Sequence, residues 1–191
     1  MKAETDQRFK ENEQRFKENE QRFKETKQLF EETDRQIQAT SLKVQEVSAQ
    51  IGRLGGRLGE FVEGFVAPAC TTLFAQRGIP IHKVSRRVEV KRPGGRHMEI
   101  DLLVVNTDTV ALVEVKSKLV QDDVREHLIR LGEFKEFFPE YADKRAIGAV
   151  AGMVVEENVI HFAIKSGLFV IVQSGESLHF ANSEEFVPRA W

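Results

Sequence analysis

The sequence predicts an α/β protein, with a mixed β-sheet covered by helices and a long heptad-repeat helix before it. An apolar residue recurs every seven positions from Phe9 to Phe65, which is typical of a long helix with one apolar seam. After Gly78, short apolar stretches of strand-like composition alternate with amphipathic stretches of helical periodicity. We therefore expect a coiled-coil helix over residues 1–52 and one folded domain over residues 53–191.

The first heptads are near-identical repeats. Gln7–Glu13 and Gln14–Glu20 both read QRFKENE, and Gln21–Lys27 reads QRFKETK. A straight helix drifts by about 20° per heptad against such a stripe, so a constant seam favours left-handed supercoiling with a partner helix. We expect a homo-oligomer assembled through residues 1–61, and the alternative is a solvated charged helix without a partner.

The seam changes character along the helix. The a positions are apolar throughout: Phe9, Phe16, Phe23, Phe30, Ile37, Val44, Ile51, Leu58 and Phe65. The d positions change from polar to apolar: Asn12, Asn19, Thr26, Thr33, Thr40, Val47, Leu54 and Phe61. We therefore expect the seam to be weak at its start and firm near residues 44–61.

Charges beside the seam favour a parallel arrangement in the first two repeats. In a parallel pair, Arg8 of one helix faces Glu13 of the other, and the second repeat offers the same complementary pair. In the third repeat, Arg22 faces Lys27 instead. Exposed pairs contribute only about 0–1 kcal/mol each, so they bias orientation without driving assembly.

The helix is expected to continue into the domain. Four glycines cost about 1 kcal/mol each relative to alanine; they are Gly52, Gly55, Gly56 and Gly59. The heptad phase nevertheless continues to Phe65, which favours one helix or a slightly kinked one, and Pro68 predicts a turn or a kink. Small residues line one side of this helix and let it approach another backbone closely. Glu63 is the charged residue of that stripe and should point toward the packing surface, whereas Glu60 should be solvated.

The remaining elements suit a mixed sheet covered on both faces. The order is helix, three strands, helix, strand, helix and one or two strands. The expected strands are residues 79–92, 98–105, 110–116, 146–151, 168–173 and 178–180, and the expected helices are residues 121–138 and 156–166. On the first of these helices, Arg125, His127 and Arg130 are expected to form a solvated face, although they could extend a basic surface.

A hairpin in this order carries charges among apolar residues. A turn centred between Thr107 and Asp108 places Asp101 opposite Glu114 and, further along the same face, Glu99 opposite Lys116. Glu99 could then hold the lysine ammonium in place. Burial of such charges is costly unless they pair or bind a metal ion.

The residue types on this face suit phosphodiester chemistry. Mg²⁺ binds through one or two carboxylates and keeps several waters, so Asp101 and Glu114 could share one ion. Lys116 could orient the attacking water or stabilise the developing negative charge. Glu63, from the helix, could supply a further metal or water contact.

These motifs resemble the PD-(D/E)XK nuclease superfamily over about residues 53–182. A helix carrying Glu63, then Asp101, then the triplet from Glu114 to Lys116 is similar to the layout of Holliday-junction-resolvase-like and restriction-endonuclease-like members. Ile100 stands where the motif has its proline, and replacement of this proline is common in that superfamily. No Gln-X-X-X-Tyr motif follows Lys116, which disfavours the subgroup that carries it.

The resemblance implies a fold, a reaction and site residues. The fold would be a restriction-endonuclease-like αβββαβ core with a mixed sheet, in a branch with an N-terminal coiled coil. The reaction would be metal-dependent hydrolysis of DNA by an endonuclease using Mg²⁺, with Mn²⁺ as an alternative. Asp101 and Glu114 would be metal ligands, Lys116 the catalytic lysine and Glu63 the helix carboxylate of the catalytic set.

One stretch of the chain is strongly basic. It contains six cations that could contact the phosphate backbone of a nucleic acid without reading sequence: Lys83, Arg86, Arg87, Lys91, Arg92 and Arg96. An equally weighted alternative is an edge hairpin whose charges discourage aggregation.

Composition limits the remaining possibilities. The chain has 191 residues and a formal net charge of −2, so any nucleic-acid surface must be local. Cys70 is its one cysteine, which excludes an internal disulfide and suits a cytoplasmic protein. We expect no membrane partner and no organic cofactor. Two alternatives stay open: a catalytically inactive nucleic-acid-binding or scaffolding module, and a coiled coil whose main role is to recruit a partner protein.

Overall fold

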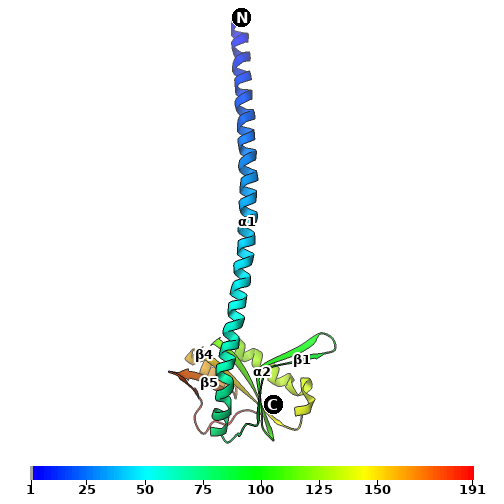
Figure 1. The fold of residues 1–191 in the computed structure, drawn as a ribbon, viewed down its shortest axis with the longest axis vertical. Helices are drawn as coiled ribbons and strands as arrows, with labels where there is room; N and C mark the ends of the chain where they lie inside the picture. Colours follow the sequence, from blue (N-terminus) through cyan, green and yellow to red (C-terminus); the bar gives the residue numbers. More distant parts are fainter. Residues whose placement is uncertain (1) are drawn as a thin grey trace. The chain divides into compact units, whose positions relative to one another are not determined.

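The computed structural model describes the backbone of residues 2–191 and the side chains of residue 8 and residues 10–191. The chain divides into two compact units between Leu54 and Gly55. Helix α1, Lys2–Gln76, contributes to both units, and each unit is described by itself below (Figure 1).

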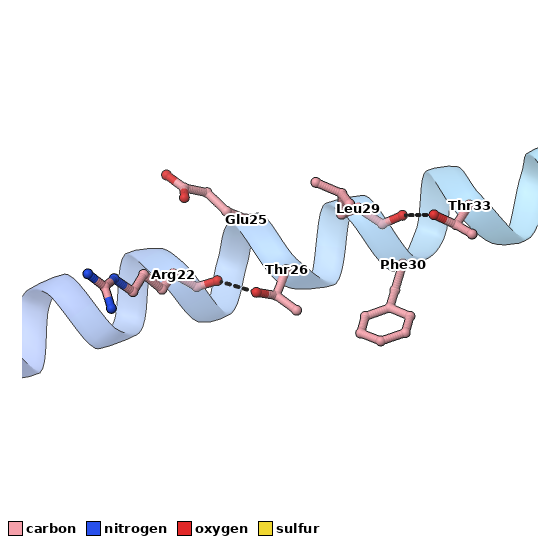
Figure 2. A pocket seen from close by; sticks show the side chains of 6 residues that line it. All are labelled: Arg22, Glu25, Thr26, Leu29, Phe30 and Thr33. Carbon is pink, nitrogen blue, oxygen red and sulfur yellow. Dashed lines mark hydrogen bonds between the residues drawn. The ribbon is translucent and has the colours of Figure 1, made fainter.

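The first unit is helix α1 up to Leu54. Its apolar seam residues are exposed from Phe16 onward, and Phe16 itself is 72% exposed. The d-position threonines turn their hydroxyl groups back onto the helix, and each Oγ1 donates to the carbonyl four residues earlier at 2.7–2.8 Å. Figure 2 shows two of these bonds, from Thr26 and Thr33, beside the projecting ring of Phe30. Because their hydroxyls are satisfied internally, these threonines are less polar toward the seam than their residue type suggests.

The second unit is a mixed six-stranded sheet with helices. Its elements after α1 are β1 Lys83–Arg92, β2 Arg96–Val105, β3 Thr109–Leu119, α2 Gln121–Phe137, η1 Pro139–Tyr141, β4 Arg145–Val155, α3 Glu157–Lys165, β5 Phe169–Ser174 and β6 Ser177–Phe180. The strands lie in sequence order; β3, β4 and β5 are parallel to one another and the other neighbours are antiparallel. The predicted α/β class, the long N-terminal helix and the mixed sheet are confirmed.

Two apolar cores cover the two faces of the sheet. On one face, α1 buries a stripe that includes Val66 and Phe74 against β2 to β5. On the other face, α2 and α3 bury residues such as Phe134 and Ala163 against the same strands. Alternating side chains of each central strand therefore enter different cores, as expected for a sheet covered on both sides.

Helix α1 differs from the expectation of a turn at Pro68, because the helix continues through this residue to Gln76. A proline inside a helix costs about 3 kcal/mol through a lost hydrogen bond and a steric clash. Val66 and Cys70, on either side of Pro68, are fully buried against the sheet, and this burial offsets the cost.

Two other local features bear on the sequence expectations. A Cβ atom added at any of the glycines from Gly52 to Gly59 would meet nothing within 4 Å, so these glycines do not mediate a close approach within the described chain, and their approach to another chain stays a prediction. The strand expected over residues 79–92 begins only at Lys83, because Ile79 still donates its N–H to the carbonyl of Phe74 at the helix end. Among the described residues, no helix combines the length and apolar character needed to cross a bilayer.

Candidate functional site

The hairpin of β2 and β3 has the predicted register. Leu102 pairs with Val113 and Val105 with Val110, and pairing stops at Leu102. Asp101 and Glu114 are the next residues along each strand, so they lie where the two strands part. The Asp101 Oδ2 atom accepts a hydrogen bond from the backbone N–H of Val115 at 2.8 Å, which ties the carboxylate to β3.

The predicted pair of Glu99 and Lys116 was wrong. Beyond Asp101, strand β2 stays paired only with β1, where Glu99 lies opposite Glu89 and is exposed. Lys116 instead places its Nζ atom 2.8 Å from Glu114 Oε1. Residues two apart on one strand share a face, so the lysine finds its carboxylate on its own strand once β2 has moved away.

Glu114 is buried among cations, with only 3% of the residue exposed. Besides Lys116 at Oε1, it has Arg130 Nη2 at 2.5 Å and His127 Nδ1 at 3.8 Å from Oε2. The Arg130 contact is an ion pair of poor hydrogen-bond angle, since Nη2 makes no well-formed hydrogen bond among the described residues. A carboxylate this deep needs such partners, because an unpaired buried charge is strongly destabilising.

His127 and Arg130 were missed as site residues, since a solvated face was the preferred expectation for them. The structure buries His127 on the face of α2 that also carries Val124 and Leu131. The spacing of these residues, three from Val124 to His127 and four from His127 to Leu131, indicates a shared helix face and could have identified His127 from the sequence. Arg130, one turn after His127, reaches Glu114 from the same side of the helix.

Burial keeps His127 neutral. It lowers the pKa of His127 to about 4, against the opposing attraction of the Glu114 charge, and the Arg130 charge lowers it further. The Nε2 atom lies 3.2 Å from the Leu112 carbonyl, so Nε2 carries the proton and donates it. Nδ1 is then unprotonated, and its lone pair faces Glu114 and has no hydrogen-bond partner among the described residues.

The pKa values of Asp101 on β2 and Lys116 on β3 are also shifted from their ordinary values. Burial raises the pKa of Asp101 to about 6, the nearby charges of Glu114 and Glu63 raise it further, and the Val115 hydrogen bond and Lys116 oppose the rise. Burial lowers the pKa of Lys116, but the Glu114 hydrogen bond and the charges of Glu114 and Asp101 outweigh it, so the net shift is upward. Lys116 is therefore an ammonium at neutral pH. Such shifts are enriched at functional sites.

Glu63, on the sheet-facing side of α1, is held by Arg87 of β1. Its side chain is 12% exposed, as expected for a residue pointing toward the packing surface. Arg87 donates from Nε to Oε2 at 3.0 Å and from Nη2 to Oε1 at 3.2 Å. Arg87 Nη1 also donates to Glu60 Oε1 at 3.0 Å, so Glu60 is paired and not merely solvated.

The donor set suits Mg²⁺ better than a metal that needs several protein ligands. Within the described part of the chain, no three Asp, Glu, His or Cys side chains are grouped as a metal site. Asp101 and Glu114 supply two carboxylates, which is enough for Mg²⁺ because this ion retains waters and binds substrate phosphate. Both oxygens of Glu114 are in ion pairs, so a bound ion would share one of them with Lys116 or Arg130 or replace that cation.

Most of the predicted basic stretch is engaged within the chain. Arg87 pairs with α1, and Lys91 lies 3.2 Å from Glu89. Two further arginines fix the hairpin to the end of α2: Arg92 donates to the Phe137 carbonyl, and Arg96 pairs with Glu136 and Glu133. For the two remaining cations, Lys83 and Arg86, the described structure shows no ion pair, and both are exposed.

Comparison with known proteins adds little. No protein-family model matches the chain, and no curated protein is detectably similar to it. One similar solved structure is that of a protein of unknown function, AF1548, with 13% sequence identity and a TM-score of 0.38. The match covers 56% of this chain and 56% of that protein, so the similarity spans little more than half of either.

Proposed function

We propose that the chain is a metal-dependent phosphodiesterase of the PD-(D/E)XK type, acting as a DNA endonuclease and assembled through its N-terminal helix. The observation that supports this proposal most is the group formed by Asp101, Glu114 and Lys116 where β2 and β3 part. A restriction-endonuclease-like core is part of the proposal, since the elements from α1 to β4 follow the order αβββαβ.

The site residues have distinct chemical roles in this proposal. Mg²⁺ at Asp101 and Glu114 would stabilise charge on a phosphodiester and lower the pKa of a bound water. The Lys116 ammonium would stabilise negative charge that develops on the phosphate oxygens. Glu63 would accept a hydrogen bond from the attacking water or from a metal-bound water, and the N–H of Val115 holds Asp101 in orientation.

Nucleic acid would contact the exposed cations of β1. Lys83 and Arg86 are the members of the basic stretch that keep free donors in the described structure. Contacts of this kind position a duplex and depend on salt, but they do not read its sequence.

Assembly would bury the exposed seam of α1 against a second copy of the chain. Within the second unit, α1 has two apolar sides: Val62 and Val66 are buried on the sheet, whereas Phe61 is 67% exposed and Leu58 is also open. The exposed residues continue the heptad phase of the first unit. Because parallel pairing is complementary in the first two repeats, we favour a parallel homo-oligomer, which would bring two or more sites together.

A second candidate is a catalytically inactive module that binds nucleic acid or serves as a scaffold. It is favoured by the two cations on Glu114, which already neutralise the carboxylate that a metal would need. A related alternative is that the exposed seam recruits a different partner protein.

A cleavage assay separates the enzyme from the inactive module. Linear duplex, single-stranded and four-way-junction DNA would be incubated with Mg²⁺ or Mn²⁺ and with wild type, Asp101→Ala or Glu99→Gln. Cleavage that requires metal and is lost only in Asp101→Ala supports the proposal. DNA binding without cleavage of any substrate favours the inactive module, and equal cleavage by all three proteins contradicts the assigned site.

A further inference from the structure

Arg87 has a backbone conformation that residues with a Cβ atom rarely adopt. Its φ is 50°, and it is the one non-glycine residue with positive φ in the described chain. In this left-handed region the Cβ atom crowds the following carbonyl, so the conformation costs free energy. Such a residue persists where surrounding contacts determine its position, and these residues are concentrated at functional sites.

Each nitrogen of the Arg87 guanidinium group donates to one of two carboxylates. Nε and Nη2 form a two-pronged pair with the oxygens of Glu63 at 3.0 and 3.2 Å, and Nη1 binds Glu60 at 3.0 Å. A fork of this kind fixes the plane and position of a carboxylate, which a lysine ammonium cannot do. The hydrogen bond and the charge of Glu63 raise the pKa of Arg87 above its usual value.

The strand register places Arg87 beside Asp101, and the charge of Glu63 acts on the Asp101 carboxylate. Arg86 pairs with Leu102 and Val88 with Ile100, so Arg87 lies level with Asp101. Both strands change faces at this level, since Leu102 enters the core under α1 and Ile100 enters the core under α2. The left-handed residue sits at that change of face.

Arg86 and Arg87 border the same open pocket of about 470 Å³ but have different surroundings. Arg86 is exposed and has no ion pair in the described structure. Arg87 shares its immediate surroundings with Glu60 and Glu63, and this group of three carries a net negative charge. A phosphate approaching Arg87 would therefore meet two carboxylates, and three of the five guanidinium N–H donors are already engaged.

We propose that Arg87 is a positioning residue, whose guanidinium holds the Glu63 carboxylate beside Asp101, and that it is not a nucleic-acid contact. The pairing itself stands on the geometry alone, whereas its effect on cleavage rests on the proposed function. The proposal removes Arg87 from the predicted nucleic-acid-binding set and leaves Arg86 in it.

Two substitutions in the full chain separate positioning from simple charge. Arg87→Lys keeps the positive charge and loses the fork, and Arg87→Asn removes the guanidinium while keeping a residue that tolerates positive φ. For both, we expect kcat for DNA cleavage to fall about tenfold or more, within the range for loss of a supporting contact, with KM within about twofold of wild type. The matched control is Arg86→Ala, which should raise KM and reduce the salt slope of DNA binding by about 1.

Two results would overturn the proposal where wild type cleaves DNA. One is a wild-type kcat in Arg87→Lys. The other is a raised KM with a salt slope reduced by about 1 in Arg87→Asn, which is the behaviour expected of a phosphate contact.

A urea-unfolding cycle tests the pairing without any need for activity. It combines Arg87→Asn with Glu63→Gln, and a parallel cycle combines Arg86→Ala with Glu63→Gln. In the first cycle, the proposal requires the double variant to lose less unfolding free energy than the sum of the losses in the two single variants. In the second cycle, the losses in unfolding free energy should be additive. Additivity in both cycles would overturn it. If wild type cleaves nothing, the proposed function fails while this cycle still decides the pairing.

Discussion

The two units of this chain use apolar residues in opposite ways. In the first unit, the seam of α1 from Phe16 to Leu54 is exposed along its described length, and the helix finds no cover within its own unit. In the second unit, the same helix buries Val66 and Phe74 in a sheet core. A helix without cover gains little from burial, so its stability must come from another chain or from the solvated helix itself. In the proposed function, assembly therefore belongs to the first unit and chemistry to the second, and substitutions in either unit test that division.

The largest expected effect is on the fold of the second unit. Phe74 is fully buried and packs edge-on against Phe169 and Phe180. We expect Phe74→Ala to lower the free energy of unfolding by about 3–5 kcal/mol through lost burial and an internal cavity. Urea unfolding followed by circular dichroism measures it. The matched change Phe30→Ala, on the exposed seam, should leave the unfolding of the second unit unchanged, and an equal loss in both would contradict the division.

The next effect is on cleavage. Lys116→Ala removes the ammonium beside Glu114, and we expect DNA cleavage to fall about 10²–10³-fold, as for the loss of one preorganised electrostatic contact. Single-turnover cleavage measures the loss. Lys118→Ala is the control, because Lys118 is on the same strand, is mostly exposed and pairs with Glu156. Assembly should be the same in wild type, Lys116→Ala and Lys118→Ala. A similar loss of cleavage in Lys118→Ala would contradict the role of Lys116.

A third effect is on the pH dependence of stability. The pKa of Asp101 is about 6 in the folded chain and about 3.8 in its ordinary state, so the folded state holds this proton more tightly. Between these values, stability must fall as pH rises, by about 2 kcal/mol after allowance for partial exposure. Asp101→Asn should flatten this part of the curve and be more stable than wild type near pH 7.5. Unfolding at a series of pH values measures it, and a steeper curve in Asp101→Asn would contradict the burial.

The smallest expected effect is on assembly. Val47 occupies a d position in the firm part of the seam and is exposed in the single chain. We expect Val47→Asp to weaken the oligomer at least tenfold, about 1.4 kcal/mol, because a carboxylate would enter the seam. Sedimentation analysis over a concentration series measures it. Ala49→Asp makes a comparable change on the outer side of the helix and should assemble as wild type does. If Val47→Asp also assembles normally, the seam does not drive assembly.

The sequence carried enough information for the elements and for part of the site. Strand alternation and the short polar turn predicted the hairpin register, and with it the placement of Asp101 and Glu114 where the strands part. The heptad phase identified the exposed side of α1, because a period of seven in the sequence maps directly onto a helix surface. Local pattern determines both features.

Other parts of the site depend on tertiary geometry. The departure of β2 from β3 removed Glu99 from Lys116, and no residue in the hairpin marks where pairing ends. The positive φ of Arg87 was equally hidden, since arginine is not a residue that suggests a left-handed conformation. The depth at which α2 packs brought Arg130 to Glu114, which its helical spacing alone allowed but did not require.

The proposed function requires Asp101 and Glu114 to form a metal site in the second unit. The most direct measurement is a calorimetric titration of Mg²⁺ and Mn²⁺ into the full chain, comparing wild type with Asp101→Asn and with Glu99→Gln. We expect wild type and Glu99→Gln to bind the metal ion and Asp101→Asn to lose that binding. Equal binding by all three proteins, or no binding to wild type at millimolar metal with or without DNA, would contradict a metal site at Asp101 and Glu114.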